Sequence, residues 1–218
     1  MNSVAVVNYG MGNLRSVSKA LEHVAPQAKI WVTQDPAQIR EADRVVFPGV
    51  GAMRDCMTEL HNQGLLDVVR ECAASRPFLG ICLGMQALLE FSEENEGTPG
   101  LGLLPGQVRR FPADLREQAH NDGDPPLKIP HMGWNQAIPN RSHPLWAGIP
   151  QDSRFYFVHS FYVAPRDGEL WAATTHYGFP FASAVARDNL FAVQFHPEKS
   201  QRAGLALLAN FMTWDGRP

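Results

Sequence analysis

The expected fold of this chain is decided by the stretch Pro77-Phe78-Leu79-Gly80-Ile81-Cys82-Leu83-Gly84-Met85-Gln86. Its apolar residues before Cys82 predict a buried strand, and the residues from Met85 to Phe91 predict a helix. Glycines two positions to either side of Cys82 give the pattern Gly-x-Cys-x-Gly, the thiol counterpart of the nucleophile elbow. A Cβ at either glycine would clash in so sharp a turn, and the helix N-terminus behind the sulfur favours a thiolate. A buried structural cysteine is the alternative interpretation.

A histidine followed closely by an acid lies near the other end of the chain. The run Leu190 to Phe195 predicts a strand, and His196-Pro197-Glu198 follows it. Residues two apart in an extended segment face the same side, and a proline disfavours a helix interior. The carboxylate of Glu198 can therefore fix the tautomer of His196 and leave the other ring nitrogen for a thiol. Solvated loop residues are one alternative. A metal site is another, which the lack of His-x-x-x-His or Cys-x-x-Cys spacing disfavours.

The composition excludes several classes of protein. The chain has 218 residues, 44% of them hydrophobic, which favours one sizeable domain over residues 1–218. A net charge of −3 gives no electrostatic footprint for nucleic acid or a membrane surface, and no apolar run approaches the roughly eighteen residues of a membrane span. The N-terminus lacks the basic region of a secretory signal. Three cysteines without scaffold spacing favour a reducing, cytoplasmic location.

Strands and helices alternate through the first ninety residues. This alternation predicts an α/β fold whose central sheet is mostly parallel and has helices on both faces. Asn13 and the pair Asp35-Pro36 are typical of helix starts. The predicted strands are Val4 to Tyr9, Ile30 to Thr33 and Arg44 to Phe47, and the predicted helices are Leu14 to Val24, one from Pro36, Arg54 to Asn62 and Leu65 to Ala74.

The second half is rich in strands. They either form an antiparallel layer of their own or extend the main sheet, and the sequence leaves both possibilities open. Asp114 to Pro126 predicts a mobile surface loop, and Asp188-Asn189 predicts a tight hairpin turn. Ser200 is typical of a cap for a last helix with Leu205, Leu208 and Met212 on one face. The predicted strands are Leu103 to Phe111, Lys128 to Ile138, Arg154 to Val163, Leu170 to Tyr177, Phe181 to Arg187 and Leu190 to Phe195.

The loop Pro48-Gly49-Val50-Gly51 supplies the remaining part of an acyl-transfer site. It follows a strand, where open α/β sheets place ligand contacts. Its glycines allow backbone N–H groups to turn toward a developing oxyanion, as the N–H of Leu83 does in an elbow. An ordinary tight turn is the alternative. The order nucleophile, histidine, acid differs from that of the α/β-hydrolases, in which the acid precedes the histidine.

The two signature blocks together resemble a known family, the class I (triad) glutamine amidotransferases. That resemblance implies a flavodoxin-like α/β fold and hydrolysis of glutamine to glutamate and ammonia, with no cofactor and no metal. Within the family, further blocks resemble the amidotransferase subunits of imidazole glycerol phosphate synthases, which implies a role in histidine biosynthesis and, for a partner, a separate (β/α)8-barrel cyclase subunit. Those blocks are Asn8 to Leu14, Pro48 to Gly51, Pro130 to Asn135, His159 to Tyr162 and Gln194 to Ser200.

The resemblance also implies roles for single residues. Cys82, His196 and Glu198 match the catalytic triad, and Gly49, Val50, Gly51 and Leu83 match the oxyanion hole. Gln86, Glu94, Ser160 and Phe161 match positions beside the glutamine substrate, and Asn13, Trp134 and Lys199 match segments that face the cyclase. One departure is Asn8, where the family more often has Asp.

Three rival functions remain at this point. An amidotransferase subunit for anthranilate or pyridoxal phosphate synthesis is the nearest, and the block Pro130 to Asn135 argues against it. A hydrolase that needs no partner would turn over glutamine fully when alone. A binding module without activity is disfavoured by the intact triad.

Overall fold

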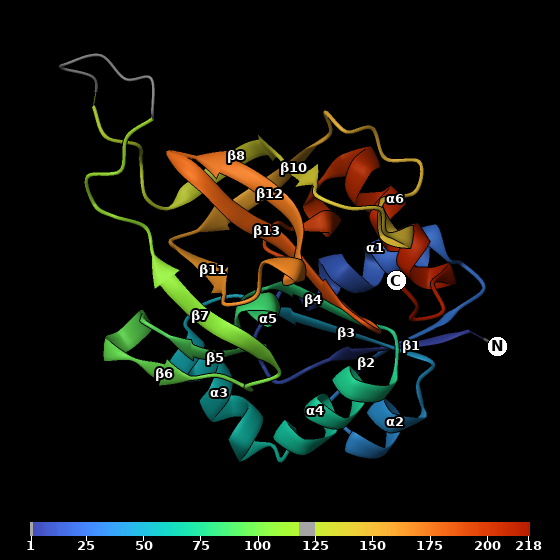
Figure 1. Ribbon diagram of the computed structural model, residues 1–218. Coiled ribbons are helices and arrows are strands. Elements are labelled where there is room, and N and C mark those ends of the chain that lie inside the picture. The colour runs from blue at the N-terminus through green and yellow to red at the C-terminus, as the bar shows by residue number, and fades with distance from the viewer. Residues whose placement is uncertain (1, 118–124) are drawn as a thin grey trace.

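The computed structural model describes residues 2–117 and 125–218, and its core is a large mixed sheet with helices on both faces (Figure 1). Five neighbouring strands are parallel, in the order β2-β1-β3-β4-β14. Every residue of β1, β4 and β14 is buried, as expected of strands covered on both sides. These strands are β1 (Ser3–Val7), β2 (Lys29–Thr33), β3 (Arg44–Gly49), β4 (Phe78–Cys82) and β14 (Leu190–Val193).

The two faces of the parallel strands carry separate cores. Side chains alternate along each strand, so Val4 and Val6 of β1 point to one core while Ala5 and Val7 point to the other. Helices α1 and α6 cover the first core, and α2, α3 and α4 cover the second (Figure 1). The helices are α1 (Leu14–Val24), α2 (Pro36–Glu41), α3 (Met53–Asn62), α4 (Leu66–Ser75), α5 (Leu83–Gln86) and α6 (Gln201–Thr213).

Most strands of the second half extend the main sheet, which decides between the two possibilities that the sequence left open. Beyond β14 the order continues β13-β11-β7-β5-β6, with β12 and β9 paired beside β13. Only β8 and β10 form a separate antiparallel pair within the described residues. The bounds are β5 (Leu89–Ser92), β6 (Thr98–Pro99), β7 (Leu104–Arg110), β8 (His131–Gln136), β9 (Ile138–Pro139), β10 (Arg154–His159), β11 (Phe161–Pro165), β12 (Trp171–Tyr177) and β13 (Phe179–Arg187).

Three sequence predictions of single elements are wrong. The predicted helix from Met85 to Phe91 ends at Gln86, because Leu89–Ser92 instead pairs as β5 with β6 and β7. The predicted strand Arg154 to Val163 is two strands, since the chain passes at Ser160 from the small sheet to the main one. Lys128 to Ile138 likewise contains both β8 and β9.

All three predicted helix caps stand directly before a helix, but only one of them makes a capping hydrogen bond. The side chain of Asp35 caps α2 by accepting from the N–H of Ala37. Asn13 and Ser200 occupy cap positions but make no capping hydrogen bond. The Ser200 hydroxyl donates to the carbonyl of His196 at 2.6 Å and accepts from the N–H of Tyr156 at 2.9 Å, so it ties the end of β14 to β10.

Of the two connections predicted from the sequence, the structure describes the turn at Asp188-Asn189 in full and the loop from Asp114 to Pro126 only in part. Asp188, with φ of +50°, forms the turn between β13 and β14, where Arg187 pairs with Leu190. Residues 118–124 of the loop predicted at Asp114 to Pro126 lie outside the described residues. At its described ends the N–H of Leu127 donates to the carbonyl of Leu115 at 2.7 Å.

Replacing Gly84 by alanine should destabilise the fold. A Cβ at Gly84 would overlap the carbonyl oxygen of Phe47, a backbone atom of the central strand β3. Overpacking of this kind costs about 1–3 kcal/mol or more of unfolding free energy. Gly168→Ala is the matched control, because a Cβ there meets nothing within 4 Å and the residue has no positive φ. Urea unfolding of both variants measures the difference, and equal stabilities would contradict the packing argument.

Candidate active site

Cys82 occupies a strained turn at the end of β4. Its φ of +55° and ψ of −112° are uncommon for a residue other than glycine, and such strain persists only where the surroundings enforce it. A Cβ at Gly80 would lie 2.9 Å from the Cβ of Ala192, and one at Gly84 would overlap Phe47. The predicted need for small residues on both sides of the cysteine is therefore confirmed.

His196 and Glu198 reach the same site from the neighbouring strand. β14 pairs with β4, so the chain leaves β14 beside the elbow. His196 Nδ1 lies 2.8 Å from Glu198 Oε1, and the two side chains are 2% and 0% exposed. The predicted contact exists, but its expected cause was wrong. Pro197–Lys199 forms the 3-10 turn η4 instead of an extended segment, and the turn brings the carboxylate back to the ring.

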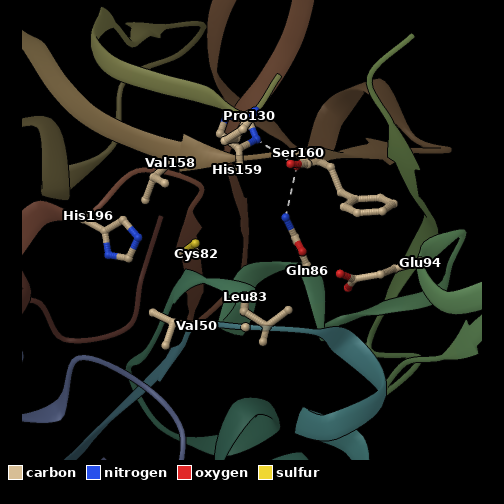
Figure 2. A pocket seen from close by; sticks show the side chains of 12 residues that line it. Val50, Cys82, Leu83, Gln86, Glu94, Pro130, Val158, His159, Ser160 and His196 are labelled. Atoms are coloured by element: carbon tan, nitrogen blue, oxygen red, sulfur yellow. Dashed lines mark hydrogen bonds between the residues drawn. The ribbon is translucent and has the colours of Figure 1, made fainter. Parts of the chain in front are cut away.

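The hydrogen bond to Glu198 fixes the orientation of the imidazole. Since Nδ1 donates to the carboxylate, Nε2 is the nitrogen directed at Cys82, and Figure 2 shows the ring facing the sulfur. Among the described residues Nε2 has no hydrogen-bond partner at normal distance. Burial lowers the pKa of His196, but interaction with Cys82 and Glu198 outweighs it and raises that pKa to about 10. The site therefore stabilises the protonated imidazolium form of His196.

Cys82 and His196 line a cavity of about 330 Å³ (Figure 2). All four residues predicted beside the substrate line it as well, as do three of the four predicted for the oxyanion hole. The further lining residues are Val50, Gly51, Leu83, Gln86, Glu94, Ser160 and Phe161, together with Pro130, Val158 and His159, which sequence reasoning missed. Gly49 is not among them. It is the last residue of β3, paired with Cys82, and has no room for a Cβ beside the Tyr9 hydroxyl.

The oxyanion-loop candidates are held by a buried tyrosine. The Tyr9 hydroxyl donates to the carbonyl of Pro48 at 3.0 Å, directly before the glycines. Gly51 has φ of +93°, a conformation that favours glycine, and the side chain of Val50 is 37% exposed at the cavity. Gly51 is therefore needed for its backbone conformation, whereas Gly49 is needed because a Cβ has no room there.

Gln86 forms a buried amide pair with Gln194, and only Gln86 was predicted from the sequence as a site residue. Its Nε2 donates to the carbonyl of Phe161 and to Oε1 of Gln194, both at 3.1 Å. The Nε2 of Gln194 in turn lies 3.8 Å from the Cys82 sulfur. Gln194 is fully buried and was noticed only as part of a block. Its position two residues before His196 at the end of β14 was the available signal.

Glu94 lies beside the start of α3, and the predicted interface residues lie at two other places. Glu94 Oε2 accepts from the N–H of Met53 at 2.7 Å, which ties it to the start of α3. Trp134, 42% exposed, packs edge-on against Tyr156, and Lys199 Nζ lies 5.8 Å above the same ring. Asn13 instead donates to Glu198 Oε1 at 3.3 Å and so lies beside the candidate triad.

Three histidines other than His196 are held neutral. Burial lowers the pKa of His131 to about 4. Burial, with Arg141 nearby, lowers that of His143 to about 4, and burial beside His131 lowers that of His159 to about 3. Within residues 2–117 and 125–218, no group of three or more His, Cys, Asp or Glu side chains is arranged to hold a metal ion. None of the helices described there is long and apolar enough to cross a membrane.

Comparison with known proteins identifies the family. The profile described as Glutamine amidotransferase class-I matches residues 5–214. Relatives named imidazole glycerol phosphate synthase subunit HisH are 64% identical in Nitrosococcus oceani and 62% identical in Methylococcus capsulatus, each over 99% of this chain and at least 98% of the relative. The chain belongs to the class I glutamine amidotransferases, among the HisH subunits. The name of these relatives disfavours the anthranilate and pyridoxal phosphate rivals.

Solved structures of lower sequence identity share the fold. PurLQS from Thermotoga maritima superposes with a TM-score of 0.71 at 16% identity, covering 97% of this chain and 98% of that one. A second solved structure, of a glutamine amidotransferase, gives 0.67 at 18% identity, covering 94% and 98%. The predicted α/β fold with a largely parallel central sheet is confirmed.

Stability should fall as the pH drops below about 6.5, the ordinary pKa of histidine. The unfolded chain protonates His131, His143 and His159 below that pH, whereas the folded chain keeps them neutral down to about 4. Each then lowers the free energy of unfolding by up to about 1.4 kcal/mol per pH unit. His196 is charged in both states there, so its own contribution is lost only between pH of about 6.5 and about 10.

Urea unfolding at about pH 7 and about pH 5 measures that slope. His143→Asn is the informative variant, because an asparagine oxygen can still accept from the N–H of Leu145 but does not titrate. Its stability should fall less between the two pH values than that of the wild type. An unchanged difference would show that His143 is not held neutral in the folded chain.

Replacing Glu198 by glutamine should lower glutamine turnover by roughly 10²–10⁴. The amide keeps the size of the side chain but loses the charge that stabilises the imidazolium of His196. The loss should be smaller than that caused by removing the nucleophile. Steady-state kinetics at saturating glutamine measure it, and turnover within about twofold of wild type would exclude Glu198 from the triad.

Proposed function

We propose that this chain is the glutaminase subunit of imidazole glycerol phosphate synthase in histidine biosynthesis, with Cys82 as nucleophile. One observation carries the assignment of the site. A cysteine in an elbow faces a histidine that is oriented by a buried acid 2.8 Å away, and both open onto one cavity. Nucleophile, base and orienting acid are the parts that acyl transfer requires.

The proposed reaction proceeds in two steps. The Cys82 thiolate adds to the side-chain carbonyl carbon of glutamine, and backbone N–H groups of Leu83 and the Gly49–Gly51 loop bind the oxyanion. His196 protonates the departing nitrogen, the C–N bond breaks, and ammonia leaves a glutamyl thioester. His196 then takes a proton from water, which attacks the thioester and releases glutamate and the thiolate. Gln86, Glu94, Ser160 and Phe161 hold the substrate in this proposal.

The product is passed to a partner in the same proposal. Free ammonia is protonated in water, so a closed route to a (β/α)8-barrel cyclase subunit preserves the nucleophile. The cyclase then makes imidazole glycerol phosphate and aminoimidazole carboxamide ribotide. The exposed apolar side chains of Met132 and Trp134 on β8, 61% and 42% accessible, support a protein partner on that face. Asn13 and Lys199 are the further interface candidates.

Two smaller proposals complete the description. Residues 1–218 are proposed to form one domain, because strands from both halves pair in one sheet. A cytoplasmic location is supported by three cysteines that are all free thiols.

Cys82→Ala should abolish the glutamine-dependent reaction of the assembled complex. The ammonia-dependent reaction should continue, because the chemistry of the cyclase needs only free ammonia. Both activities are measured on the reconstituted complex with saturating ribonucleotide. Glutamine-dependent activity like that of the wild type would refute the nucleophile, and loss of both activities would refute the division of labour between the subunits.

A further inference from the structure

A line of hydrogen-bonded groups begins on β8 and runs inward. Asn135 Nδ2 lies 3.2 Å from His131 Nε2. His131 Nδ1 lies 2.9 Å from His159 Nε2, and His159 Nδ1 lies 2.7 Å from the carbonyl oxygen of Phe161. His131 and His159 are 3% and 6% exposed, so each depends on its neighbours for hydrogen bonds.

The same carbonyl joins this line to the active site. Phe161 O accepts a second hydrogen bond, from Gln86 Nε2 at 3.1 Å, which Figure 2 draws beside Ser160. Gln86 Nε2 also reaches Gln194 Oε1, and Gln194 Nε2 lies 3.8 Å from the sulfur of Cys82. A continuous set of contacts, which includes the backbone carbonyl of Phe161, therefore connects His131 with Cys82.

Elementary chemistry determines which group donates and which accepts in each hydrogen bond of the histidine pair. A carbonyl oxygen only accepts, so His159 Nδ1 carries the proton. Burial lowers the pKa of His159 to about 3 and that of His131 to about 4, so both rings are neutral. His159 Nε2 therefore carries no proton and accepts from His131 Nδ1. His131 Nε2 is then an acceptor and receives the amide hydrogen of Asn135. Each donor meets an acceptor, which defines one tautomer for each ring.

We propose that His131 and His159 are positioning residues of the glutaminase site, which fix the Phe161 carbonyl. Through it they fix the amide of Gln86 and, in turn, the amide of Gln194 that lies beside Cys82. The proposal rests on the proposed function. Neither histidine touches the reacting atoms in this role. They act by holding a carbonyl between the cavity wall and the aromatic core, where a small displacement moves both amides together.

A role in packing alone makes the opposite prediction. The His159 ring lies among Phe111, Phe157 and Phe181, with ring centroids 5.3, 5.7 and 5.3 Å away. If His159 only fills this aromatic core, phenylalanine should replace it better than the smaller asparagine. If it positions Phe161, asparagine should be the better replacement, because its amide nitrogen occupies the place of Nδ1 and can donate to the carbonyl.

The test compares His159→Phe with His159→Asn in the reconstituted complex. His159→Phe should lower kcat for glutamine hydrolysis by about 10- to 100-fold, with a smaller change in KM. His159→Asn should recover most of that loss, even if its thermal unfolding temperature is the lower of the two. Ammonia-dependent activity should be the same in both. Equal kcat values, or a higher kcat in the phenylalanine variant, would overturn the proposal.

A second pair keeps the test valid if a His159 variant does not fold. His131→Asn retains a donor for His159 Nε2, whereas His131→Phe keeps the ring stacked on Tyr177 at 4.0 Å but has no donor. The asparagine variant should again have the higher kcat, and the reverse order would overturn the proposal. Wild type and Cys82→Ala are assayed alongside. Glutamine hydrolysis that is absent in the wild type or present in Cys82→Ala refutes the proposed function instead.

Discussion

The close approach of Gly84 to the carbonyl of Phe47 is the constraint on which the rest of the site depends. With no Cβ in the way, the turn after β4 packs directly against β3, and Cys82 is held at a positive φ. The sulfur then stands at the carboxyl end of the parallel strands, where the loop after β3 also begins. The strained backbone of the candidate nucleophile is thus maintained by ordinary backbone packing around it.

The sheet order brings the remaining catalytic candidates to the same edge. β14 lies next to β4 although strands β5 to β13 come between them in the chain, and the parallel pairing places His196 beside the elbow. The turn η4 and the hydroxyl of Ser200 then fix where the imidazole and carboxylate meet. Asn13, from the loop after β1, adds a donor to the same carboxylate. The segments after β1, β4 and β14 therefore meet at one candidate catalytic site.

Local patterns in the sequence were sufficient for the elbow, the alternating first half and the existence of the His196–Glu198 contact, but not for the 3-10 turn that makes this contact. They failed where long-range pairing overrides local preference. Leu89–Ser92 looks helical by its residues, yet β7 offers it an edge to pair with. Asn13 and Ser200 look like helix caps by sequence, yet their side chains have distant partners. Asn13 donates to the carboxylate of Glu198, and the Ser200 hydroxyl accepts from the N–H of Tyr156. Gln194, His131 and His159 lie in sequence blocks that carry the family resemblance, but their individual roles could not be predicted, because their contacts exist only after the strands assemble.

The central claim is that Cys82 alone is the nucleophile, and covalent labelling tests it most directly. The chain contains two internal controls, since Cys56 and Cys72 are 0% and 1% exposed and burial raises the pKa of both thiols, that of Cys56 to about 12. The complex is treated with 6-diazo-5-oxo-L-norleucine, and labelled peptides are identified by mass spectrometry. The account predicts an adduct on Cys82 only, with glutaminase activity lost in proportion to labelling. Glutaminase activity that survives complete labelling of Cys82, or inactivation with the adduct elsewhere, would contradict it.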